Sequence, residues 1–148
     1  NEKMNKNEFK IYPDENLIDF AKHLEEEHKL NIIRPENYGK SISDIEQLRI
    51  ANKNHAFLLT RNERHFLNIP NLFDFIDEGG VIIVNTDPYN ICYDICDLAK
   101  WRSLDIKRKI FRLTCEGIEV ISKNMKSGKI LPKQNPCAIC PEKCNCRK

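Results

Sequence analysis

The stretch of sequence that decides the fold is SDIEQLRIANKNHAFLLTRNERHF, residues 43–66. Ser43 is a good helix N-cap, and Glu46 stands three residues later, where a capping-box partner belongs. The predicted helix leads into residues 56–59, which are all apolar, as expected for a central parallel strand covered on both faces. The polar residues 60–63 end that strand. The segment therefore predicts one unit of an α/β sheet with a polar cluster at the carboxyl end of its strand.

The same alternation of element types extends on both sides of this unit. From Pro88 onward the pattern becomes helical and predicts helices over residues 91–104 and 105–126. Strand-helix repetition implies right-handed crossovers, so we expect a three-layer α/β/α fold with a central parallel sheet of four or five strands and a basic helical C-terminal extension. The other predicted elements are strands at 9–12, 31–33, 56–60 and 81–84, and helices at 16–28, 63–68 and 72–77.

Composition and length predict one compact domain with a short appendage. The chain has 148 residues, of which 41% are hydrophobic and 31% are charged. We expect a polar N-terminal segment at residues 1–8, an α/β domain at 9–128 that includes the C-terminal helices, and a Cys-rich tail at 129–148. The chain has no run of about 18 apolar residues and its start is polar, so we expect no membrane span, no secretion signal and a cytoplasmic location.

Polar side chains follow the first and third predicted strands and open the intervening helix. Asp14 follows the first strand, Asp44 opens the helix, and Asn62 and Glu63 follow the third strand. Open α/β sheets bind ligands outside the carboxyl ends of their strands. Oxygen ligands gathered there suit Mg²⁺ or Mn²⁺, which can activate water against a phosphodiester, and Thr60 can orient Asp14 or the water. The alternative is that the two aspartates only cap helices.

Three short motifs stand at these positions: Asp14-Glu15-Asn16-Leu17, DIEQLRIA at residues 44–51 and LLTRNERHF at residues 58–66. Together they resemble the compact branch of PIN-domain nucleases, a family that includes VapC-type toxin ribonucleases, over roughly residues 9–86. The resemblance implies three acidic positions, of which Asp14 and Asp44 match the first two. Asn62 stands where the third aspartate belongs; its carbonyl oxygen can still bind a metal ion, but it adds no negative charge. Glu63 is the candidate to supply that charge.

The resemblance implies a divalent-metal-dependent ribonuclease that uses Mg²⁺ or Mn²⁺. It also suggests the toxin of a toxin-antitoxin pair, with RNA as substrate, an antitoxin-like protein as partner and a homodimer as one assembly. Two alternatives stay open. The first alternative to the ribonuclease is a non-catalytic nucleic-acid-binding module on a degenerate PIN scaffold. The second is a metal-sensing or protein-interaction module that uses the Cys-rich tail.

Charge is distributed unevenly along the chain. Residues 1–98 hold 11 Lys and Arg against 18 Asp and Glu, a net charge of −7, whereas residues 99–148 hold 13 against 4, a net charge of +9. A basic third beside an acidic body favours a polyanionic substrate. The alternative is that these charges form the solvated face of a helix. The side chains expected to contact RNA, besides Thr60, are Arg61, Lys107, Arg108 and Arg112.

The tail contains four cysteines within ten residues. Cys137 and Cys140 have the CxxC spacing of a zinc knuckle, and Cys144 and Cys146 can complete a four-sulfur Zn²⁺ site. Disulfide bonds or thiols without a metal are the alternatives.

Cys92 and Cys96 are four residues apart, which places both thiols on one face of a predicted helix. They either join two tail cysteines around a metal ion or lie in the core, and their apolar neighbours favour the core. No histidine has a partner at the spacing of a zinc helix motif, so we expect structural or exposed roles for His23, His28, His55 and His65.

Overall fold

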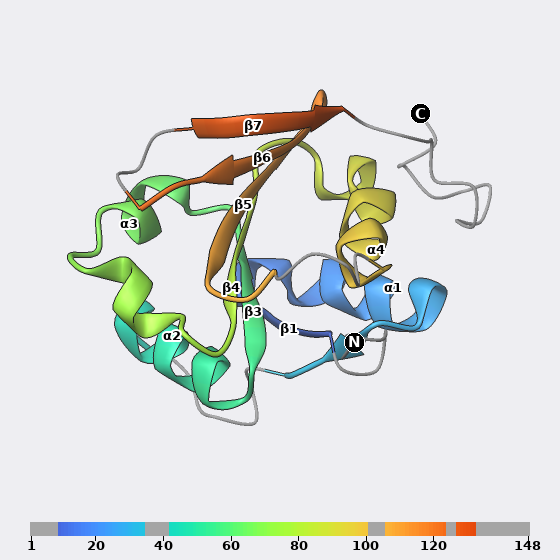
Figure 1. The fold of residues 1–148 in the computed structure, drawn as a ribbon. Coiled ribbons are helices and arrows are strands. Elements are labelled where there is room, and N and C mark those ends of the chain that lie inside the picture. The colour runs from blue at the N-terminus through green and yellow to red at the C-terminus, as the bar shows by residue number, and fades with distance from the viewer. Residues whose placement is uncertain (1–8, 35–41, 101–105, 124–126, 133–148) are drawn as a thin grey trace.

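A seven-stranded sheet runs through the middle of the molecule (Figure 1). The structure, a computed structural model, describes residues 9–34, 42–100, 106–123 and 127–132. The strand order is β2-β1-β3-β4-β5-β6-β7; the first five strands in this order run parallel, and β6 and β7 are antiparallel to their neighbours. The strands are β1 (Lys10–Pro13), β2 (Asn31–Ile32), β3 (Ala56–Thr60), β4 (Gly80–Val84), β5 (Lys109–Thr114), β6 (Gly117–Ile121) and β7 (Ser127–Pro132).

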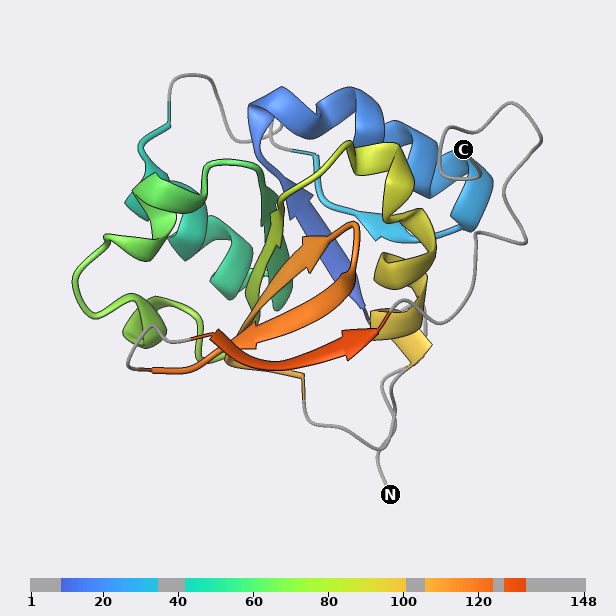
Figure 2. The ribbon, with the colours of Figure 1, turned by 90° about the horizontal axis from the view of Figure 1, so that it is seen from above.

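Helices cover both faces of the sheet. Figures 1 and 2 show α1 and α4 on one face and α2 and α3 on the other. None of the helices in the described ranges is long and apolar enough to cross a membrane. The α-helices are α1 (Ile18–His28), α2 (Asp44–Lys53), α3 (Glu63–Leu67) and α4 (Cys92–Lys100), and the 3₁₀ helices are η1 (Glu15–Leu17), η3 (Leu72–Phe75) and η4 (Pro88–Asn90).

Two hydrophobic clusters join these layers. Successive side chains of a strand point to opposite faces, so each central strand feeds both clusters. In β3, Leu59 packs in the cluster that contains α1 and α4, whereas its neighbour Leu58 packs in the cluster that contains α2 and α3. All five residues of β3 are buried, as predicted for a central strand. The α/β class is therefore confirmed, with helical layers on both faces of the sheet.

The local signals around α2 act as the sequence predicts. The backbone N–H of Glu46 donates to Oγ of Ser43 at 3.2 Å, so Ser43 is the N-cap of α2. The helix ends before His55, which has a positive φ of 58°, and β3 begins at the next residue. This turn reverses the chain direction between α2 and β3.

The predicted helix over residues 105–126 is wrong. Within the described part of this segment, residues 109–114 form β5 and residues 117–121 form β6, joined by a tight turn at residues 115–116. Gly117 has a φ of 140°, a conformation that side chains disfavour. The basic extension is thus a hairpin that widens the sheet and makes it mixed, rather than a helical appendage. β7 crosses the boundary at residue 128 that we expected between domain and tail.

The strand order creates a switch point between β1 and β3. The connection from β1 through α1 leads to β2 on one side, and the connection from β2 through α2 returns to β3 on the other side. Chains that leave adjacent strands in opposite directions open a crevice at the carboxyl ends of those strands, where doubly wound proteins bind ligands. Pro13 of β1 pairs with Leu59 of β3, so Asp14 and Thr60 lie at this crevice.

Candidate functional site at the carboxyl edge of the sheet

A buried hydrogen bond links the ends of β1 and β3. Asp14 is only 6% exposed, and Thr60 is completely buried. The hydroxyl of Thr60 donates to Oδ2 of Asp14 at 2.9 Å, and the Asp14 backbone N–H donates to the carbonyl of Leu59 at 2.8 Å. Asp14 precedes η1 but makes no side-chain capping bond to it. The carboxylate is therefore oriented by the neighbouring strand, and the helix-cap alternative for Asp14 is not what the structure shows.

The same hydroxyl also positions Asn62. Thr60 Oγ1 accepts a hydrogen bond from the Asn62 backbone N–H at 2.9 Å while it donates to Asp14. Asn62 precedes α3 without capping it through its side chain, and it is partly exposed. Thr60 thus ties the loop that carries Asn62 to the carboxylate of Asp14. The bond to Asp14 was predicted from the sequence, and the bond to the Asn62 backbone was not.

Asp44 lies at the N-terminus of α2 and faces α3. Because Ser43 caps the helix, the Asp44 side chain is left for other contacts. Its Oδ2 atom lies 3.8 Å from Nδ1 of His65, and the two side chains are 36% and 62% exposed. A carboxylate in the first turn of a helix is stabilised by the positive end of the helix dipole. Asp44 is therefore a partly exposed acidic group beside α3.

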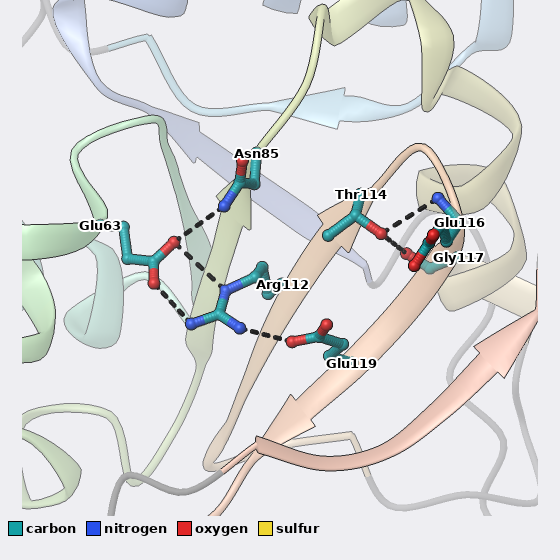
Figure 3. A network of polar contacts seen from close by, with 7 residues as sticks. All are labelled: Glu63, Asn85, Arg112, Thr114, Glu116, Gly117 and Glu119. Carbon is teal, nitrogen blue, oxygen red and sulfur yellow. Dashed lines mark hydrogen bonds and ion pairs between the residues drawn. The ribbon is translucent and has the colours of Figure 1, made fainter.

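Glu63 is held by a network that the sequence did not predict (Figure 3). Both of its carboxylate oxygens accept from Arg112, at 3.2 Å from Nε and 2.5 Å from Nη2, and Oε1 also accepts from Asn85. The other side of the guanidinium donates to Glu119 at 2.5 Å. Arg112 was expected on a helix that grips RNA, but it lies in β5 and bonds two carboxylates. The negative charge of Glu63 is thus matched by Arg112, which weakens the case that it replaces a third aspartate.

The environment of Arg112 favours its charged form. Burial lowers the pKa of the guanidinium, but the hydrogen bonds and negative charges of Glu63 and Glu119 outweigh burial and raise the pKa above its ordinary value. Paired hydrogen bonds between a guanidinium and a carboxylate are among the stronger polar contacts in proteins. The network therefore joins α3, β5 and β6 into one side of the candidate site.

A polar pocket of about 390 Å³ opens at the ends of β3 and β4. Two exposed arginines contribute to its rim, and the side chains of Asn62 and Asn85 add amide groups. Guanidinium and amide donors around a small opening suit a phosphate oxygen. The lining residues are Arg61, Asn62, Glu63, Arg64, Val84, Asn85 and Thr86.

Two other predicted RNA contacts lie at the opposite end of the strands, near the amino ends of β4 and β5. Lys107 and Arg108 precede β5, and the Arg108 backbone N–H donates to the carbonyl of Gly79 just before β4. Because β4 and β5 are parallel, these residues are separated from the pocket by the length of a strand, about 15 Å. The structure therefore brings Arg61 to the site but does not bring Lys107 or Arg108.

The predicted carboxylates do not form a compact cluster. Among the described residues, the only group of three His, Cys, Asp or Glu side chains whose ligand atoms lie within 4.8 Å of one another is elsewhere, between α1 and α4. Asp14, Asp44 and Glu63 therefore do not make a three-carboxylate centre in this conformation. The tail cysteines predicted to bind Zn²⁺ lie outside the described residues: Cys137, Cys140, Cys144 and Cys146.

Comparison with known proteins adds no assignment to this geometry. No family model, no curated protein and no solved structure matches the chain.

Proposed function

We propose that the chain is a divalent-metal-dependent ribonuclease of PIN-like type that acts at the crevice between β1 and β3. The observation that carries the proposal is the buried hydrogen bond from Thr60 to Asp14, at the switch point of the sheet. Burying a carboxylate costs folding free energy unless hydrogen bonds or a positive charge offset the lost hydration, and the Thr60 hydroxyl offsets part of this cost at Asp14. A cation bound at the crevice would offset more of it.

The oxygen donors at this edge are of the chemical type that Mg²⁺ or Mn²⁺ prefers. Asp14, Asp44 and Glu63 do not form a compact group in this structure, so side chains must move to share one ion. Asp14 and Asp44 supply carboxylates, and Asn62 supplies a carbonyl oxygen next to the loop that Thr60 holds. When bound, such an ion lowers the pKa of a water molecule and stabilises negative charge on a phosphoryl oxygen. Two carboxylates and one amide bind the ion less tightly than three carboxylates, so millimolar concentrations of metal are expected to be needed.

The remaining residues bind and orient the substrate. Arg61 and Arg64 line the pocket at the ends of β3 and β4, where they would hold a phosphate of single-stranded RNA. A water oxygen forms a bond to the phosphorus, the bond from phosphorus to one ribose oxygen breaks, and a proton from the water ends on that ribose oxygen. Arg112 acts indirectly, because it holds Glu63 and so fixes the start of α3. A toxin of a toxin-antitoxin pair is the cellular context that the resemblance suggests.

A non-catalytic RNA-binding module is the second candidate. Asn62 in place of a third aspartate and the pairing of Glu63 with Arg112 both lower the negative charge available to a metal ion. The arginine-rimmed pocket does not depend on that charge. In this case the chain binds RNA at the same edge without cutting it.

Cleavage of labelled single-stranded RNA in Mn²⁺ or Mg²⁺ tests the proposal. The set contains the parent chain, Asp14→Asn, Asp44→Asn, Asn62→Asp and an EDTA control. Asp19→Asn is the matched control, since Asp19 is an exposed aspartate in the first turn of α1. We expect the parent chain to cut RNA in a metal-dependent way. Asp14→Asn and Asp44→Asn should each reduce the cutting rate by about 100-fold or more, and the control variant Asp19→Asn should leave it unchanged.

The other outcomes separate the two candidates. If only Asn62→Asp cuts RNA, the parent chain is a nuclease fold whose catalysis is prevented by asparagine at position 62. Binding of RNA without cutting by any variant would favour the non-catalytic module and reject the ribonuclease.

A further inference from the structure

A second group of chemically reactive side chains lies between α1 and α4, which are side by side in Figures 1 and 2. His23 and His28 come from α1 and Cys92 from the start of α4, and their ligand atoms lie within 4.8 Å of one another. Cys96 follows one turn later, with its Sγ atom 3.5 Å from Nδ1 of His28. Two imidazoles and one thiol therefore converge from two helices that are far apart in the sequence, and a second thiol contacts one of the imidazoles.

We propose that these four side chains bind one Zn²⁺ ion and that the ion fastens α1 to α4. Zinc bonds of about 2.3 Å to sulfur and about 2.0 Å to nitrogen place neighbouring sulfur and nitrogen ligands about 3.5 Å apart in a tetrahedron. The separation of Cys96 and His28 already has this value. His23, His28 and Cys92 have ligand atoms within 4.8 Å of one another, and Cys96 lies outside that group. Side-chain rotations that bring Cys96 toward His23 and Cys92 complete the four-ligand set.

The donor set selects the class of metal. Thiolates and imidazoles bind soft or borderline ions such as Zn²⁺, whereas Mg²⁺ and Mn²⁺ prefer oxygen. The site is thus chemically distinct from the oxygen-rich edge around Asp14. Four protein ligands leave no open position for water or substrate, which is typical of a structural rather than a catalytic zinc ion.

Burial supports a metal ion over an accidental cluster. His28 is 1% exposed, and Cys92 and Cys96 are completely buried in the hydrophobic cluster that joins α1, α4 and the sheet. Imidazole nitrogens and thiolates bind zinc strongly, so an ion at this place would stabilise these groups where they are buried. His23 is partly exposed, so an ion can reach the cluster from solvent.

The competing explanation is ordinary core packing. The ring of His23 lies 5.1 Å from that of Tyr89 and 5.3 Å from that of His28, and buried cysteines often serve as small hydrophobic residues. Packing alone predicts a chain that binds no zinc here and whose stability does not respond to a chelator. The two explanations therefore differ in metal content and in thermal stability.

The test uses the full-length chain with all four tail cysteines changed to serine, so that the tail cannot bind the metal. We expect one zinc per chain by elemental analysis after purification with zinc, and thiolate-to-metal absorption bands when Co²⁺ replaces it. At zinc concentrations about 100-fold above its dissociation constant, the melting temperature is expected to rise by about 5 to 10 °C over the EDTA-treated chain.

Variants in the same background assign the ligands. Cys92→Ser, Cys96→Ser and His23→Gln are each expected to abolish the Co²⁺ bands or shift them and to lower zinc affinity by at least about tenfold. Cys115→Ser, in the exposed turn between β5 and β6, is the control and should change neither. His23→Gln changes a partly exposed side chain, so it keeps the test valid if the buried variants fail to fold. Absence of zinc and of Co²⁺ bands in the folded parent chain would overturn the proposal, as would equal affinity in His23→Gln.

Discussion

Replacing Arg112 with methionine is expected to destabilise the protein by about 2 to 3 kcal/mol. The guanidinium donates hydrogen bonds to both Glu63 and Glu119, and the side chains of Arg112, Glu63 and Glu119 are 20%, 30% and 16% exposed. Methionine keeps an unbranched apolar stem of similar reach but leaves two carboxylates without their shared cation. Removing one partner of a fully buried ion pair costs about 3 to 5 kcal/mol, and an exposed pair contributes about 0 to 1 kcal/mol. The loss expected for Arg112→Met lies between these values because the network is partly buried.

Urea unfolding followed by circular dichroism measures this loss, and a drop of about 4 to 12 °C in the melting temperature should accompany it. Arg49→Met is the matched control, because Arg49 pairs with Glu46 at 3.6 Å with both side chains more than half exposed, and it should cost about 0.5 kcal/mol or less. Adding Glu63→Gln to Arg112→Met should recover part of the loss. If Arg112→Met and Arg49→Met cost the same, the network does not hold this side of the site together.

Three further changes test other parts of the account. Gly79→Ala would place a methyl group 2.2 Å from the carbonyl oxygen of Ala56, so we expect a loss of about 3 kcal/mol or more, or failure to fold, in the same urea assay. Thr60→Val leaves the Asp14 carboxylate without its donor and should cost about 1 to 3 kcal/mol, whereas Thr60→Ser keeps the hydroxyl and should cost clearly less. Burial lowers the pKa of His23 below 6.5. In EDTA the unfolded chain therefore takes up more protons than the folded chain as the pH falls through 6.5, and stability is lost on acidification. The melting temperature of His23→Gln should depend less on pH than that of the parent chain.

The sequence predicted the first part of the fold because several local signals agree there. Ser43 and Glu46 mark the start of α2, the apolar residues 56–59 of β3 mark a central strand, and Thr60 marks its end. These signals act over a few residues, so they do not depend on partners elsewhere in the chain. For the same reason Asp14 and Thr60 were expected at one edge, and the structure joins them.

The hairpin of β5 and β6 was missed because its charges imitate an exposed helix face. Lys107, Arg108 and Arg112 recur at spacings that a helix would place on one side, but Arg112 and Glu119 are paired across the two strands. Gly117 was the available turn signal, since a positive φ at this position favours glycine. The pairing of Glu63 with a residue 49 positions away has no local signal at all.

The cluster between α1 and α4 was missed for a related reason. His23 and His28 are five residues apart, outside the usual helix spacing for a zinc pair, and their cysteine partners come more than sixty residues later. Only the packing of the two helices on one face of the sheet brings these groups together.

The central claim is that Asp14 binds a divalent ion at the crevice between β1 and β3. Titration of the zinc-saturated chain with Mn²⁺ by isothermal calorimetry tests it most directly, because saturation removes competition from the cysteine and histidine groups. We predict one Mn²⁺ per chain, bound more weakly by about tenfold or more in Asp14→Asn and with parent affinity in Asp19→Asn. Equal Mn²⁺ affinity in the parent chain and in Asp14→Asn, or no binding by the folded parent chain, would contradict the account.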